Sequence, residues 1–209
     1  MQIAIRSTEH QKKELLEKGI SKKVTVHWLA SDKKLSSVNA DVYFDLVFND
    51  AAPSANELVD DKPVFTHAVN CVCTEINKPN YIRLNAWNGF INRPVTELAC
   101  NSETTKKIAA EVLDKLGWNV EWVTDDYGLI AARIITMIIN EAYFALEQKV
   151  STKAQIDIAM KLGTNYPYGP FEWSEKIGLQ NILFLLQKLQ MHNKRYSISS
   201  LLVHESQHF

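Results

Sequence analysis

The sequence has no excess of charge of either sign and no apolar run suited to crossing a membrane. Lys and Arg total 23 of the 209 residues against 24 Asp and Glu, for a formal net charge of −1. A chain this close to neutral lacks the basic surface that binds nucleic acid or an anionic membrane, so we expect neither as a partner. The most apolar segment, 129–146, contains Arg133, Asn140 and Glu141, which argue against a membrane span.

Cysteine is also scarce. Cys71, Cys73 and Cys100 are an odd number, and the first two lie too close in the sequence for an ordinary disulfide. No second cysteine pair or nearby histidine cluster completes a metal site around them, so no metal is expected. Free thiols are typical of a reducing compartment. Since the N-terminus also lacks a basic start followed by a long apolar stretch, we expect no signal peptide and a cytoplasmic location.

What is present is an ordinary globular composition, with 46% hydrophobic and 22% charged residues. In the first half, short strand-like segments rich in Val, Ile and Phe alternate with helical ones. The expected strands are 2–6, 24–28, 41–48, 63–68, 81–87, 94–100 and 120–123, and the expected helices are 8–18 and 102–116. This alternation predicts a mostly parallel sheet with right-handed crossovers.

Local signals set the ends of these two helices. Thr8 and Gln11 form the pattern of a capping box, and Gly19 stands just past the helix end. Ser102 is expected to cap the second helix at its start, and Gly117 to end it.

The second half reads as helical throughout. The segment 129–150 has helical spacing and is apolar on nearly every side, which indicates burial in a core or against a partner. Thr152 with Gln155 predicts a capped second helix that stops at Gly163, and Pro170 suits the first position of a third. Another apolar helix is expected at 179–189. The sequence therefore predicts an α/β domain at 1–125 and an all-α domain at 126–209.

The second half resembles the C-terminal domain of the 3-hydroxyacyl-CoA dehydrogenases. The matching segments keep the family's order and nearly its spacing, and they are 128–133 (GLIAAR), 140–142 (NEA), 156–163 (IDIAMKLG), 169–172 (GPFE) and 177–179 (IGL). The first half is similar more faintly, through 40–45 (ADVYFD) and through 74–76 and 83–98. The resemblance implies a trimmed Rossmann-like domain followed by a helical domain. It also implies a homodimer, because the helical domain makes much of the family's dimer interface.

The resemblance implies an NAD site, but the residues for one are replaced. The turn after the first strand, 6–11 (RSTEHQ), has no glycine to let the backbone approach a pyrophosphate, and Glu9 would repel its charge. His27, Trp28 and Leu29 stand where the family has the acidic residue that binds the ribose. We therefore expect no bound cofactor.

The family's catalytic residues are replaced as well. Glu97 matches the family's Glu, but twelve residues earlier Asn85 stands in place of the catalytic His, and Asn takes up no proton near neutral pH. Val69, or Asn70 if the strand shifts by one residue, stands at the family's Ser. Ala132 stands at its Asn.

Three hypotheses about function remain open. In the first, the chain is a degenerate family member that binds an acyl-CoA, another small molecule or a protein partner. In the second, it is an active 3-hydroxyacyl-CoA (3-hydroxybutyryl-CoA) dehydrogenase of fatty-acid metabolism, which would need NAD and a substitute base such as His67 acting with Glu97. In the third, a different cofactor occupies a remodelled cleft. The missing glycine turn and Asn85 favour the first.

Overall fold

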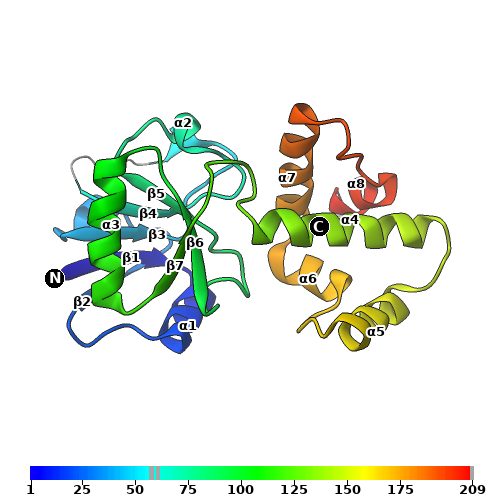
Figure 1. The fold of residues 1–209 in the computed structure, drawn as a ribbon, viewed down its shortest axis with the longest axis horizontal. Helices are drawn as coiled ribbons and strands as arrows, with labels where there is room; N and C mark the ends of the chain where they lie inside the picture. Colours follow the sequence, from blue (N-terminus) through cyan, green and yellow to red (C-terminus); the bar gives the residue numbers. More distant parts are fainter. Residues whose placement is uncertain (57–58, 60–61, 208–209) are drawn as a thin grey trace. The chain divides into compact units, whose positions relative to one another are not determined.

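The computed structural model describes residues 1–56, 59 and 62–207, and the chain forms two compact units. The first is Met1–Leu129 and the second Ile130–Phe209. The sequence predicts the boundary between the two domains near Asp125, just after the last predicted strand. Figure 1 shows that the first unit combines strands and helices and that the second is helical.

The sheet of the first unit runs in the order β2-β1-β3-β4-β5-β6-β7 within the described residues. Its strands are β1 (Gln2–Ser7), β2 (Thr25–Ala30), β3 (Val42–Asp45), β4 (Val64–His67), β5 (Tyr81–Leu84), β6 (Val95–Ala99) and β7 (Asn119–Trp122). The β5–β6 pair is antiparallel, and the other neighbouring pairs are parallel. The predicted mostly parallel α/β sheet is therefore confirmed.

Alternating residues of the strands feed two cores, as the period of a strand requires. Ile3 and Ile5 join one apolar cluster, which also contains residues of α1 (Glu9–Lys18) and α3 (Glu103–Leu116). Ala4 joins a second cluster with Leu35, from the short helix η1 (Leu35–Ser37). Helices α1 and α3 therefore cover the same face of the sheet. The shorter helices of this unit are η2 (Pro53–Ala55) and α2 (Cys73–Ile76).

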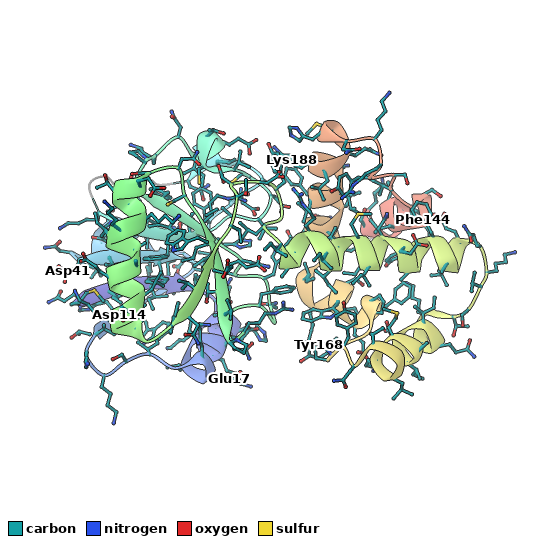
Figure 2. All side chains as sticks on the ribbon, viewed as in Figure 1. Glu17, Asp41, Asp114, Phe144, Tyr168 and Lys188 are labelled. Carbon is teal, nitrogen blue, oxygen red and sulfur yellow. The ribbon has the colours of Figure 1, made fainter. Side chains whose placement is uncertain are left out.

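The predicted caps of α1 and α3 are confirmed. Thr8 and Gln11 form the capping box, and Gly19 ends α1 with a φ of 91°. The Ser102 side chain accepts a hydrogen bond from the Thr105 amide, and Gly117 ends α3 in the left-handed region with a φ of 74°. Side chains such as Glu17, Asp41 and Asp114 lie exposed on the surface of this unit (Figure 2).

The second unit contains α4 (Ala131–Glu147), α5 (Lys153–Thr164), α6 (Pro170–Ile177), α7 (Leu179–His192) and α8 (Ser200–Ser206). The capping box of Thr152 with Gln155 and the place of Pro170 in the first turn of α6 are as predicted. The predicted stop at Gly163 is wrong. Helix α5 runs on to Thr164 and ends at Asn165, whose φ of 54° is left-handed, a conformation that Asn tolerates well.

Buried Asp157 of α5 holds the start of α6. Its carboxylate accepts hydrogen bonds from the Phe171 amide at 2.8 Å and the Glu172 amide at 3.3 Å. Those amides belong to the first turn of α6 and have no partner within the helix, so the carboxylate satisfies them and matches the helix dipole. This contact leaves no room at Gly169, where an added Cβ would lie 2.3 Å from Oδ1 of Asp157.

Gly169→Ala should therefore destabilise the protein by about 2–3 kcal/mol, because Asp157 has to move away from the amides it caps. Gly163→Ala is the matched control, since Gly163 lies within α5 and an added Cβ meets no atom within 4 Å. That change should stabilise the protein by roughly 0.5–1 kcal/mol. Urea denaturation measures both, and equal stability of the two variants would contradict the role given to Gly169.

Candidate functional site

The sheet reverses its strand order at β1, which has β2 on one side and β3 on the other. In open α/β sheets, ligands bind outside the carboxyl ends of the strands at such a point. Here the Arg6 guanidinium of β1 pairs with Asp45, its register partner on the adjacent strand β3. Its Nε lies 2.9 Å from Oδ1 of Asp45 and its Nη2 lies 2.5 Å from Oδ2. The Asp45 side chain is 1% exposed, so this bidentate ion pair is buried at the position where a ligand would enter.

Two backbone amides at the start of α1 donate hydrogen bonds to side chains of the same helix start. The Thr8 amide donates to the Gln11 side chain at 2.9 Å, and the Gln11 amide donates to the Thr8 hydroxyl at 3.2 Å. The Gln11 side chain also reaches across the sheet edge and donates to the carbonyl oxygens of Leu46 and Ala86, at 2.7 and 3.1 Å. A dinucleotide phosphate needs free amides at this helix start, and the Thr8 and Gln11 amides already have partners within the chain.

Asn85 directly follows β5, and Glu97 belongs to the neighbouring strand β6. The antiparallel β5–β6 register pairs Arg83 with Ala99 and Leu84 with Leu98 and ends there, one residue before Asn85. The Asn85 side-chain oxygen accepts a hydrogen bond from the Trp87 amide at 2.9 Å. Among the described residues its buried Nδ2 has no acceptor.

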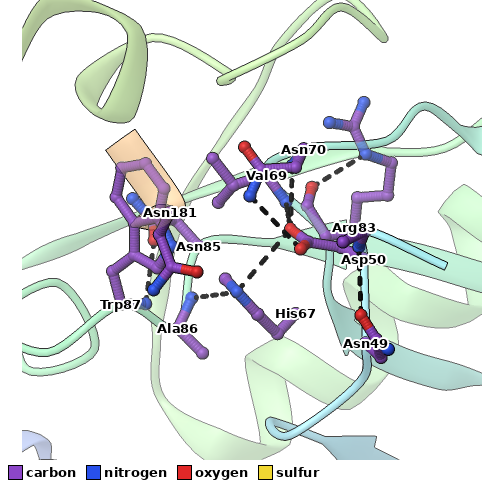
Figure 3. Close-up of polar contacts among 12 residues, drawn as sticks. Asn49, Asp50, His67, Val69, Asn70, Arg83, Asn85, Ala86, Trp87 and Asn181 are labelled. Atoms are coloured by element: carbon purple, nitrogen blue, oxygen red, sulfur yellow. Dashed lines mark hydrogen bonds and ion pairs between the residues drawn. The ribbon is translucent and has the colours of Figure 1, made fainter. Parts of the chain in front are cut away.

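His67, at the end of β4, is held by Asp50 and the backbone (Figure 3). Its Nδ1 accepts a hydrogen bond from the Ala86 amide at 3.1 Å, and its Nε2 lies 3.7 Å from Oδ2 of Asp50. The same Asp50 oxygen accepts hydrogen bonds from the amides of Val69 and Asn70, both at 2.8 Å. Burial lowers the pKa of His67, and the carboxylate of Asp50 opposes this only in part.

Two buried charged groups of this edge are not among the residues singled out from the sequence. One is Asp50, and the signal that could have found it is its place two residues after the predicted strand 41–48. The other is Arg83, whose side chain is fully buried. The Arg83 guanidinium pairs with Asp125 and donates to the carbonyl oxygens of Ala68 and Asp126, at 3.0 and 3.2 Å. Nothing local in the sequence connects these residues, which lie 42 positions apart.

Of the residues singled out from the sequence, Val69 and Asn70 lie beside His67 through their bonds to Asp50. Ala132 belongs to the other unit, in α4, where it is fully buried. Within residues 1–56, 59 and 62–207, no group of three or more His, Cys, Asp or Glu side chains is placed to hold a metal ion. In that same part of the chain, no helix is both long enough and apolar enough to cross a bilayer.

Comparison with known proteins relates part of this chain to a known family. Residues 128–205 match the family described as "3-hydroxyacyl-CoA dehydrogenase, C-terminal domain". The chain is 41% identical over 110 residues to 3-hydroxyadipyl-CoA dehydrogenase of Escherichia coli strain K12, a match that covers 52% of this chain and 23% of that protein. The second unit of the chain therefore resembles the C-terminal domain of the 3-hydroxyacyl-CoA dehydrogenases.

A second relative is 3-hydroxybutyryl-CoA dehydrogenase of Bradyrhizobium diazoefficiens, 36% identical over 103 residues, or 48% of this chain and 35% of that protein. The chain thus spans well under half the length of these curated relatives. The crystal structure of (S)-3-hydroxybutyryl-CoA dehydrogenase from Ralstonia eutropha has a TM-score of 0.73 over 97% of this chain and 92% of that one. At 15% identity, this likeness shows a shared fold.

The burial of His67 predicts a dependence of stability on pH. The unfolded imidazole titrates near 6.5, whereas the folded one has a lowered pKa, so below about pH 6.5 the unfolded state binds more protons. The free energy of unfolding should therefore fall as the pH drops from about 7 toward 5, and should fall less in His67→Gln. Urea denaturation at several pH values tests this. His192→Gln, which changes an exposed histidine, should keep the wild-type slope; the same slope in His67→Gln would show that the imidazole is not held neutral.

Proposed function

We propose that this chain is a family member that does not carry out NAD chemistry itself and that acts by binding a partner chain or an acyl-CoA. The observation that supports this most directly is the Arg6–Asp45 ion pair across the sheet edge at β1 and β3. We infer that a dinucleotide bound at that place would compete with this buried ion pair. Removing one partner from such a pair costs about 3–5 kcal/mol.

The replacement of the catalytic base supports the same proposal. In the resemblance to the family, Asn85 takes the place of the catalytic His, and Glu97 takes the place of its partner Glu. Asn offers no proton-accepting nitrogen near neutral pH. His67 already uses Nδ1 as an acceptor for the Ala86 amide and directs Nε2 toward Asp50, which suits a structural role.

An active 3-hydroxyacyl-CoA dehydrogenase is the second candidate, and the comparisons favour it. The relatives that match are named dehydrogenases, at up to 41% identity over about half of this chain. Glu97, which matches the Glu of the family's acid–base pair, is also retained in this sequence. This candidate requires NAD, together with a base at or near Asn85.

NADH titration followed by nicotinamide fluorescence separates the two candidates. The proposal predicts no saturable signal into the millimolar range and no NADH consumption when acetoacetyl-CoA is added. The 3-hydroxybutyryl-CoA dehydrogenase of Bradyrhizobium diazoefficiens serves as the positive control, because acetoacetyl-CoA is the oxidised form of its named substrate. Saturable binding with NADH consumption that Glu97→Gln abolishes would overturn the proposal in favour of the dehydrogenase, and His67→Gln would then test the substitute base.

The helical unit supports a partner-binding role and, as part of this proposal, a homodimer. Large apolar side chains stay exposed on α4 and α5, among them Ile134, Ile158 and Leu162, the last of which is 83% exposed. Ile158 and Leu162 are four residues apart on α5 and so lie on one face of the helix. Exposed apolar residues grouped in this way mark an interaction surface.

Leu162→Lys should therefore weaken self-association. Burying a leucine stabilises an interface by about 1.5–3 kcal/mol, so the dimer dissociation constant should rise by roughly tenfold to a hundredfold. Light scattering after size exclusion over a range of concentrations measures it. Met191→Lys, at an exposed site on α7, is the matched control and should leave the constant unchanged. A monomeric wild type would contradict the homodimer.

A further inference from the structure

The helical unit contains a cavity of about 210 Å³. The side chains that matter for its chemistry come from α4 to α8, and they are Tyr143, Lys153, Phe171, Glu175, Leu179 and Glu205. All of these residues belong to the second unit. Drug-sized ligands occupy sites of about 300–1,000 Å³, so this cavity suits a smaller molecule with about one ring, and it is too small for a nucleotide.

Two aromatic rings form the apolar wall of the cavity. The centroids of Tyr143 and Phe171 lie 5.1 Å apart with their planes at 66°. The Lys153 ammonium lies over both rings, with Nζ 5.5 Å from the Tyr143 centroid and 5.4 Å from the Phe171 centroid. The faces of aromatic rings attract cations. The wall therefore already holds one cation, supplied by the chain itself.

The charged groups of the cavity also favour a cation. Nζ of Lys153 lies 2.6 Å from Oε2 of Glu205, which also accepts a hydrogen bond from the Tyr143 hydroxyl at 2.8 Å. Glu175 adds a second carboxylate, so the lining contains one ammonium and two carboxylates. Burial, the Glu205 hydrogen bond and the charges of Glu205 and Glu175 all raise the pKa of Tyr143, so its hydroxyl stays a neutral donor.

An anionic ligand would meet two costs in this cavity. It would compete with Glu205 for Lys153, and it would come close to the charge of Glu175. The phosphates of CoA and a free acyl carboxylate are therefore disfavoured here. A ligand with an ammonium group instead gains attraction from Glu175 and from the aromatic faces.

From this geometry we propose that the cavity binds a small organic ammonium with an apolar body, of the arylalkylamine class. The apolar body packs against Phe171 and Leu179, and the ammonium lies toward Glu175 and Glu205. Lys153 competes with the ligand for the ring faces and for Glu205, so it limits the affinity. The site lies within the helical unit and does not depend on the absence of NAD chemistry, so the NADH titration and the test below can fail separately.

Three probes with the same ring and different head groups test the charge preference: 2-phenylethylamine, 2-phenylethanol and 3-phenylpropionate. Each is titrated into the full chain by isothermal titration calorimetry. The amine should saturate and bind about tenfold more tightly than the alcohol, since cation–π contact and one carboxylate together supply about 1.4 kcal/mol. The propionate should bind most weakly. No saturation by the amine, or equal binding of all three, would overturn the proposal.

Two variants move the amine's affinity in opposite directions. Glu175→Gln, at an exposed side chain, should weaken binding about threefold to tenfold, the worth of a partly exposed charge contact. Lys153→Met keeps the length of the side chain and removes the competing ammonium, so the amine should bind more tightly. Glu141→Gln, at an exposed position of α4 that does not line the cavity, is the control.

Circular dichroism checks that each variant is folded. If Lys153→Met does not fold, Glu175→Gln alone tests whether the amine binds in the cavity. An affinity unchanged by Glu175→Gln would show that the amine binds elsewhere and would reject the cavity as its site. A lower affinity in folded Lys153→Met would show that Lys153 helps to bind the ligand, which contradicts competition.

Discussion

The ion pair between Arg6 and Asp45 joins β1 to β3 at the place where the strand order of the sheet reverses. Asp45 is fully buried, and burial raises its pKa in spite of the guanidinium beside it. A charge in that position is stable only when it is paired and hydrogen-bonded. The pair therefore stabilises the sheet at the position where this fold ordinarily receives a ligand.

The rest of the sheet edge follows the same rule. Asp50 accepts hydrogen bonds from two backbone amides and lies close to His67. Arg83 forms an ion pair with Asp125 and donates hydrogen bonds to two backbone carbonyl oxygens. Each of these side chains satisfies groups left over where the strands end. The amides and charges of the edge are thus committed to protein contacts, which limits what a ligand could displace at low cost.

The sequence predicts the parts of the structure that depend on neighbours in the chain. Thr8 with Gln11 and Thr152 with Gln155 are local capping patterns, and both form as predicted. Gly163 shows the limit of such signals, because Asn165 two residues later competes for the same role. The resemblance to the family singles out Asn85 and Glu97 from their spacing in the sequence. The Arg83–Asp125 pair could not be predicted from the sequence, because this contact depends on the order of strands in the sheet.

The helical unit resembles the family more closely in sequence than the α/β unit does. The packing and binding constraints on the residues of each unit account for this difference. In the helical unit, Asp157 caps α6 and lies so close to Gly169 that a side chain there would not fit. Together with Pro170 in the first turn of α6, these residues require one local geometry. Its sequence, at 128–205, matches the family. In the α/β unit, the glycines of a dinucleotide turn are needed only where a backbone must approach a pyrophosphate. In this chain Arg6 and Gln11 stand in that region and stabilise the fold through contacts with Asp45, Leu46 and Ala86, which is consistent with a shared fold at 15% identity.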